Sequence, residues 1–189
     1  RDTWLERINA GGFVGYVIII ILILGLAMGA LRFKFLNEES KSINKELETN
    51  QFADDSILGK LNSIYSKYTG DNPEDLESQL EDILAKATPP LEKNLSVIKL
   101  LAAVAPLLGL LGTVIGMIET FQAITLFGTG DPKLMAGGIS QALVTTMLGL
   151  IAAVPLLFVH NILDSRSRAI SQIYEEQAIG LLALVSIKK

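Results

Sequence analysis

The chain has 189 residues, of which 50% are hydrophobic and 19% charged, and its mean hydropathy is +0.43. This composition excludes an ordinary soluble domain and predicts a membrane protein. The sequence has no cysteine and one histidine, so it offers no disulfide, thiolate site or histidine pair for a metal. A net charge of −4 without a dense basic patch argues against nucleic-acid binding. No catalytic pair, phosphate loop or cofactor motif is present, so we expect neither an enzyme nor a cofactor.

Three apolar segments are long enough to cross a bilayer, which needs about 20 residues as helix. Residues 11–31 and 134–163 contain no formal charge, and residues 100–127 contain only Glu119. Residues 1–10 form a flank that precedes the first span, and residues 128–133 form the turn between the second and third. The predicted fold is therefore an all-α integral membrane protein with three transmembrane helices that continue into long helical cytoplasmic extensions.

The positions of lysine and arginine predict the orientation, because positive flanks are retained in the cytoplasm. Residues 32–99 and 164–189 are therefore expected in the cytoplasm, the second as a C-terminal helix, and the N-terminus and the 128–133 turn outside. The basic residues that flank the spans on the predicted inner side are Arg32, Lys34, Lys41, Lys45, Lys93, Lys99, Arg166 and Arg168, against Arg1, Arg7 and Lys133 on the other side.

The region 32–99 carries two amphipathic helical patterns. Asn72 is the predicted N-cap of the second pattern, with Pro73 in its first turn. The charged run 37–41 is interpreted as a solvated face. The first apolar set is Phe52, Ile57, Leu58, Leu61, Ile64, Tyr65 and Tyr68, and the second is Leu76, Leu80, Ile83, Leu84 and Ala87.

Small residues line the second and third spans, where helices associate by close packing. Gly112 and Gly116 form a GxxxG surface that Gly109 extends, and Gly149 is the matching residue of the third span. Packing alone explains these glycines, so GxxxG is a weak functional signal.

Polar residues share faces with these small residues, at about 100° per residue. Thr145 shares a face with Gln141 on the third span, and Thr146 lies beside it. The corresponding face of the second span contains Pro106, Gly109, Thr113, Gly116, Met117 and Thr120.

The depths of the threonines can be compared through the turn. If Asp131 caps the third helix and the second ends near Phe127, Thr113 and Thr146 each lie fourteen residues from it, or about 21 Å. They are therefore predicted at one level. The alternative is that each hydroxyl bonds only the preceding turn of its own helix.

Glu119 is the one acid within the spans, and an acid in a membrane is a functional hypothesis by default. It lies about eight residues, or 12 Å, from the outer helix end and away from the face of Thr113. We therefore favour a structural or gating contact over a proton relay.

Two motifs resemble a known family. Ala105-Pro-Leu-Leu-Gly-Leu-Leu-Gly-Thr-Val-Ile-Gly-Met117 and Gly138-Ile-Ser-Gln-Ala-Leu-Val-Thr-Thr-Met-Leu-Gly-Leu-Ile-Ala-Ala-Val-Pro155 are similar to paired signatures of the MotA/TolQ/ExbB proton-channel family, closest to ExbB-like members. The stretch Gly11-Gly-Phe-Val-Gly-Tyr-Val-Ile18 resembles accessory (TtpC-like) ExbB-like proteins of TonB systems. Such proteins carry an extra periplasmic region, which is expected to precede Arg1.

The resemblance implies a homopentamer in the lipid of the bacterial inner membrane, with the second and third spans around a lumen. The lumen is expected to hold a dimeric, ExbD-like single-span partner, whose intramembrane aspartate passes protons beside Thr113 and Thr146. The other residues expected along this pathway are Thr145, Gln141, Pro106 and Thr120. A TonB-like protein then delivers work to outer-membrane receptors for iron complexes. Gln141 stands where many ExbB-like sequences have glutamate, which weakens a proton site on this chain.

Other functions stay open on the sequence. A TolQ-like role in envelope maintenance is the nearest alternative, and a flagellar stator is disfavoured because only three spans are visible. A non-conducting scaffold is the alternative from another class. The sequence leaves proton or sodium, and TonB or Tol partners, undecided.

Overall fold

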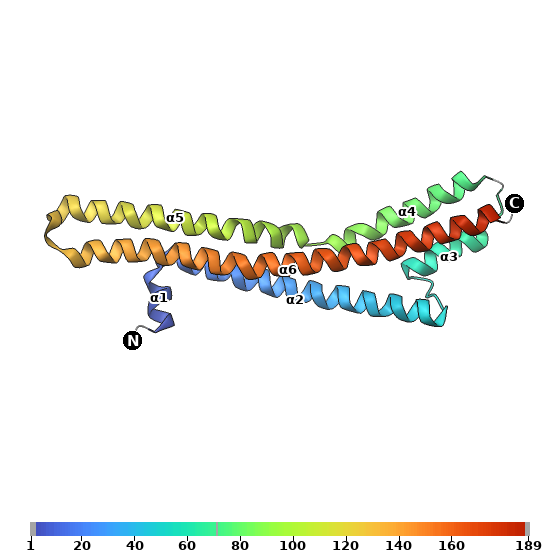
Figure 1. Ribbon diagram of the computed structural model, residues 1–189, viewed down its shortest axis with the longest axis horizontal. Coiled ribbons are helices and arrows are strands. Elements are labelled where there is room, and N and C mark those ends of the chain that lie inside the picture. The colour runs from blue at the N-terminus through green and yellow to red at the C-terminus, as the bar shows by residue number, and fades with distance from the viewer. Residues whose placement is uncertain (1–2, 71, 188–189) are drawn as a thin grey trace. The chain divides into compact units, whose positions relative to one another are not determined.

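The computed structural model describes residues 3–70 and 72–187, which form helices and contain no strand (Figure 1). Predictions that involve Arg1, Asp71 and the last two lysines lie outside the described residues. The elements are α1 (Trp4–Ala10), α2 (Gly12–Thr49), α3 (Ile57–Lys67), α4 (Pro73–Glu92), α5 (Leu95–Phe127), the 3₁₀ turn η1 (Gly128–Gly130) and α6 (Pro132–Ile187).

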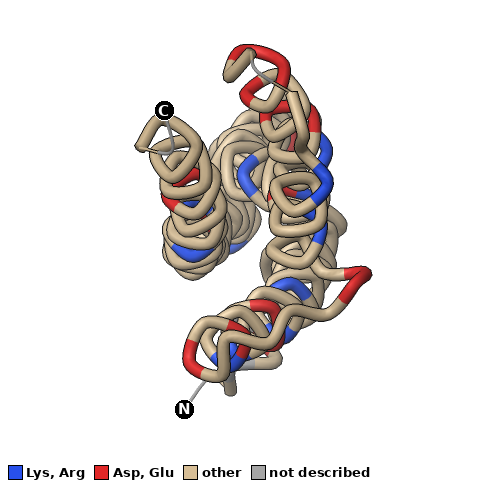
Figure 2. Tube along the Cα trace, turned by 90° about the vertical axis from the view of Figure 1, so that its right-hand side faces the viewer, with Lys and Arg blue, Asp and Glu red and all other residues tan. Residues whose placement is uncertain are grey.

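Three helical stretches are long and apolar enough to cross a membrane, and they lie in α2, α5 and α6. Figure 2 colours the lysines and arginines blue and the aspartates and glutamates red. Segments 11–31 and 134–163 contain none of these charged residues and are therefore drawn in tan. The all-helical class and the three candidate spans agree with the sequence prediction.

The helices continue past the predicted span limits. α2 has 38 residues and α6 has 56, so neither is interrupted near residues 31–32 or 163–164. Gly29 and Asn161 lie near those points, but the helices continue through both residues. α4 and α5 are separate, because Asn94 adopts φ 65°, a left-handed conformation that asparagine tolerates.

The chain divides into two compact units. Unit 1 comprises residues 1–30 and 96–161, and unit 2 comprises residues 31–95 and 162–189. In unit 1, α5 and the first part of α6 are antiparallel neighbours joined by η1 (Figure 1).

α2 packs against this hairpin inside unit 1. Its Val14 and Ile18 form a buried cluster with Ala105 of α5 and Ala152 of α6. Further along, a Cβ atom on Gly25 would lie 2.4 Å from the Leu156 side chain. The absence of a side chain at Gly25 therefore lets α6 approach α2.

Unit 2 contains the two amphipathic helices. α3 packs on α4, and their fully buried side chains include Leu58, Leu61, Leu76 and Leu80. The predicted N-cap is confirmed, because the Glu74 amide donates to Asn72 Oδ1 at 3.2 Å. The first apolar set extends beyond its helix at both ends, since α3 begins after Phe52 and ends before Tyr68.

Arg32 caps the end of α4 in unit 2. Its Nη2 donates to the carbonyl oxygens of Pro90 at 2.6 Å and Leu91 at 3.1 Å, and its guanidinium lies 4.5 Å from the Phe35 ring centroid. Burial lowers the Arg32 pKa. Because a helix ends with unpaired carbonyls and a partial negative charge, a cation at this point stabilises it.

Replacing Arg32 with methionine is expected to loosen the last turn of α4. Hydrogen bonds to a charged group contribute about 1.5–3 kcal/mol, so exchange of the Thr88, Leu91 and Glu92 amides should accelerate at least tenfold. Lys34→Met is the matched control, because Lys34 is exposed and makes only a 4.0 Å ion pair. Equal exchange in the two variants would exclude the capping role.

Candidate functional site

The α5–α6 contact is a direct approach of two backbones. A Cβ atom on Gly109 would lie 2.9 Å from the Thr145 carbonyl oxygen, and one on Gly149 would lie 2.7 Å from that of Ala105. Gly116 faces the carbonyl of Gly138 at 2.8 Å in the same way. These separations leave no room for a side chain, so the glycines set the distance between the helices.

Three threonine hydroxyls meet at the level of this contact. Thr113 Oγ1 lies 2.5 Å from Thr146 Oγ1, and these two atoms come from different helices. The carbonyl oxygens of Gly109 and Ala142 lie within 3.4 Å of Thr113, Thr145 and Thr146. Equal distances from the turn therefore bring Thr113 and Thr146 together, as their predicted depths indicate.

Thr113 can form a hydrogen bond within its own helix and also one to the neighbouring helix. Thr113 contacts the carbonyl of Gly109 on its own helix at 3.3 Å and that of Ala142 on α6 at 3.2 Å. A hydroxyl has one proton and two acceptor lone pairs, so these bonds are alternatives rather than simultaneous donations. The Thr113–Thr146 pair can therefore exchange donor and acceptor roles without moving its helices.

Exposure separates these threonines into two kinds. Thr113 and Thr146 are half-buried, whereas Thr145 is only 1% exposed and Thr120 only 3%. Thr145 packs on Gly112 and donates to the carbonyl of Ala142 at 2.8 Å. Thr120 and Thr145 lie inside the helix pair, so only Thr113 and Thr146 can reach a group outside it without the helices separating.

Gln141 lies on another side of α6. Its amide nitrogen is 2.9 Å from the position that a Cβ atom of Gly12 would occupy, so it faces the start of α2 in the same chain. Pro106 is half-buried one turn before Thr113 on α5, a helix that continues through it. The structure therefore does not bring Gln141 or Pro106 into the hydroxyl cluster.

Glu119 is exposed, and within residues 3–70 and 72–187 it makes no hydrogen bond or ion pair. The contact that we favoured for this acid is therefore not made within the described part of its own chain. Those residues also contain no group of three or more histidine, cysteine, aspartate or glutamate side chains arranged for a metal ion.

Sequence reasoning missed the backbone part of the cluster. The carbonyls of Gly109 and Ala142 are acceptors shared between two helices. The spacing contained a signal for Ala142, which precedes Thr145 and Thr146 by three and four residues, the offsets at which a hydroxyl reaches back.

Three apolar spans and a close-packed helical hairpin define a multi-pass helical membrane protein. Residues 38–176, which include α5 and the hydroxyl cluster, match the MotA/TolQ/ExbB proton channel family, and the chain belongs to that family.

Individual relatives carry ExbB and TolQ names. A biopolymer transport protein ExbB homolog of Methanothermobacter thermautotrophicus is 28% identical over 180 residues, which are 87% of this chain and 64% of that protein. ExbB-like protein 1 of Helicobacter pylori is 26% identical across 96% of this chain and 97% of its own length. Tol-Pal system protein TolQ of Haemophilus influenzae is 37% identical over 84 residues, 44% of this chain and 37% of that protein. The chain thus spans less than two thirds of the first relative.

Proposed function

We propose that the chain is the ExbB-like subunit of a proton-driven motor of the bacterial inner membrane, which energises TonB-dependent uptake of iron complexes. Five copies surround a lumen with their second and third spans. An ExbD-like partner helix occupies the lumen, and a TonB-like protein transmits the work. The observation that carries this proposal is the half-buried Thr113–Thr146 hydroxyl pair in a hairpin otherwise closed by small residues.

The hydroxyl pair suits a titrating partner carboxyl. A threonine hydroxyl can donate to a carboxylate and can accept from a carboxylic acid, so it stabilises the aspartate before and after protonation. The 2.5 Å contact lets one hydroxyl turn outward while the other keeps a carbonyl. The two charge states of the partner acid then differ little in free energy, which is what rapid proton loading and release require.

The outer surface of the hairpin supports assembly with lipid and with other copies. Large apolar side chains are exposed along both helices, and a membrane protein covers such faces with acyl chains or partner helices. They include Leu107, Leu110, Leu111, Val114 and Ile118 on α5, and Leu143, Leu150, Ile151, Val154 and Leu157 on α6.

The lysine and arginine positions support an orientation with the N-terminus in the periplasm and the C-terminus in the cytoplasm. In this orientation the hydroxyl pair lies about 21 Å along the helices from the periplasmic turn. A partner carboxyl at that depth would be separated from water on both sides.

Cysteine crosslinking tests the lumen assignment, because the sequence has no native cysteine to interfere. Thr113→Cys, coexpressed with a partner that carries cysteine one helical turn from its aspartate, is expected to form a disulfide. Ile118→Cys is the control, since Ile118 is exposed on a different face of α5. A co-purified complex in which Thr113→Cys forms no partner disulfide, or no more than Ile118→Cys, would reject the assignment.

The TolQ relative favours a second candidate, a motor subunit for envelope maintenance. It uses the same channel chemistry with a different periplasmic protein. Identification of the periplasmic protein that co-purifies with the assembled complex distinguishes the two.

A further inference from the structure

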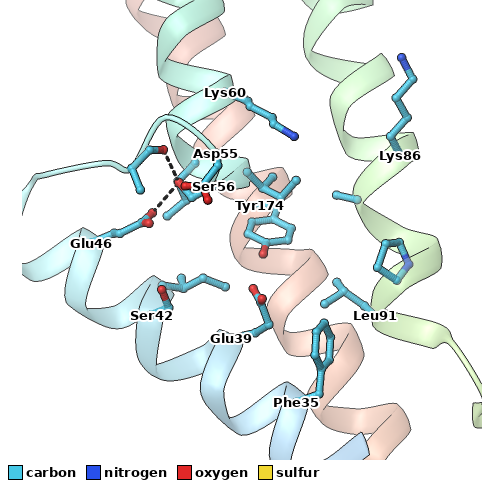
Figure 3. Close-up of a pocket in the computed structure, with 16 residues that line it drawn as sticks. Phe35, Glu39, Ser42, Glu46, Asp55, Ser56, Lys60, Lys86, Leu91 and Tyr174 are labelled. Atoms are coloured by element: carbon cyan, nitrogen blue, oxygen red, sulfur yellow. Dashed lines mark hydrogen bonds between the residues drawn. The ribbon is translucent and has the colours of Figure 1, made fainter.

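Unit 2 contains a cavity of about 430 Å³ that the proposed channel does not use. Figure 3 shows it between side chains from α2, α3, α4, α6 and the loop before α3. Its apolar walls include Ile43, Leu58 and Leu91, and polar groups converge on it from α2 and α6.

Two carboxylates from α2 line the cavity. Glu39 and Glu46 are seven residues apart, so they lie on the same face of the helix and about 10 Å apart along its axis. Burial and the charge of Glu46 raise the pKa of Glu39. Glu46 is itself 9% exposed and accepts a hydrogen bond from the Ser56 hydroxyl at 3.1 Å.

Tyr174 reaches the cavity from α6 and provides evidence for a ligand that is independent of the two carboxylates. Its side chain is only 4% exposed, and its hydroxyl points toward Glu39 in Figure 3. Among residues 3–70 and 72–187 this hydroxyl makes no hydrogen bond. Burial and the charges of Glu39 and Glu46 raise its pKa. The Tyr174 hydroxyl faces the cavity beside Glu39, so it can bond a polar ligand atom held there.

The charges facing the cavity indicate a cation. Three acids, Glu39, Glu46 and Asp55, line it against two lysines, Lys60 and Lys86. Lys86 forms an ion pair of 2.6 Å with Asp82, which does not line the cavity. Figure 3 shows both lysines at the end of the cavity away from Glu39. The described residues hold no three-acid group suited to a metal, which favours an organic cation.

We propose that this cavity binds a short linear diammonium ion. One ammonium group lies between the Glu39 carboxylate and the Tyr174 hydroxyl oxygen, and the other contacts Glu46. The methylene chain packs on Ile43, Leu58 and Leu91. An ammonium group donates up to three hydrogen bonds, and carboxylate and hydroxyl oxygens are its acceptors.

Calorimetric titration of the full chain in detergent with 1,4-diaminobutane tests the proposal. Saturable binding of one molecule per chain is expected, and Glu39→Gln and Glu46→Gln should each weaken it at least tenfold. Tyr174→Phe keeps both acids and should weaken it severalfold. Glu48→Gln is the matched control, because Glu48 is an exposed acid on the same helix that does not line the cavity.

Specificity and folding are controlled separately. Butan-1-amine has a single charge and should bind at least tenfold more weakly than the diamine. Circular dichroism should show unchanged helicity in each variant. The proposal is overturned by absence of saturable binding to the wild-type chain, by equal affinity for the monoamine, or by equal losses in Glu39→Gln and Glu48→Gln. Thr113→Val should bind the diamine normally, so this result is independent of the channel.

Discussion

Thr113→Val is expected to abolish energised transport while leaving the complex assembled. Valine keeps the shape of threonine but cannot donate or accept, so Thr146 loses its 2.5 Å partner and any acid in the lumen loses one hydroxyl. Proton-driven uptake should fall at least about tenfold, which corresponds to about 1.4 kcal/mol of barrier. The measurement is uptake of a labelled iron complex, with the assembly followed by size-exclusion chromatography.

Thr125→Val is the matched control for this variant. Thr125 is an exposed threonine of the same helix whose hydroxyl bonds only the Phe121 carbonyl one turn back, at 2.9 Å. It should transport normally, and Thr113→Ser should restore at least half of the activity because it returns the hydroxyl. Normal transport by Thr113→Val would exclude a pore role for this residue.

Gly149→Ala is expected to separate the α5–α6 hairpin. The added methyl group would lie 2.7 Å from the Ala105 carbonyl oxygen, and that oxygen belongs to a helix backbone that cannot turn aside. Overpacking of this kind costs about 1–3 kcal/mol. The midpoint of unfolding in sodium dodecyl sulfate, followed by circular dichroism, should therefore fall, and transport should fall with it because Thr113 and Thr146 move apart.

Gly137→Ala adds the same methyl group to the same helix in open space, where no atom lies within 4 Å. Alanine is a better helix former than glycine by up to about 1 kcal/mol, so this control should be neutral or slightly stabilised. If both variants unfold at the same midpoint, close approach at Gly149 does not determine hairpin stability.

The hairpin was predictable because its turn contains local signals. α5 ends at Phe127, and the Asp131 carboxylate accepts from the Lys133 amide at 3.0 Å as α6 begins at Pro132. Those two limits place Thr113 and Thr146 at one level. The sequence also predicted the small-residue faces, since glycine spacing depends on helix geometry alone.

Side-chain direction around a helix was less predictable where a third helix intervenes. Gln141 shares a face with Thr145 and was expected along the lumen, which stays a prediction. In this chain Thr145 is buried against α5 and Gln141 faces Gly12. The position of α2 decides this, and no local pattern in α6 specifies it. The long helical extensions of α2 and α6 were predicted, whereas the residues at which these helices end were not, because hydropathy marks where a helix leaves the membrane and not where it ends.

The cavity of unit 2 could not be predicted from the charge pattern. The run 37–41 was interpreted as a solvated face, which holds for Glu38. It is wrong for Glu39, which is half-buried against Tyr174. These two residues are 135 positions apart, and only the packing of α2 and α6 within unit 2 brings them together.

The membrane voltage acts differently on the two ends of α6. Thr146 belongs to the apolar span predicted at residues 134–163, whereas Tyr174 and the acids that it faces lie outside the three spans predicted from the sequence. An electric potential of 100 mV does about 2.3 kcal/mol of work on each elementary charge that crosses the hydrocarbon. In the proposed channel, a proton that passes Thr146 would therefore draw energy from the field. In the proposed orientation, a diammonium ion beside Tyr174 would cross no part of the field, and its cytoplasmic concentration alone would determine its occupancy.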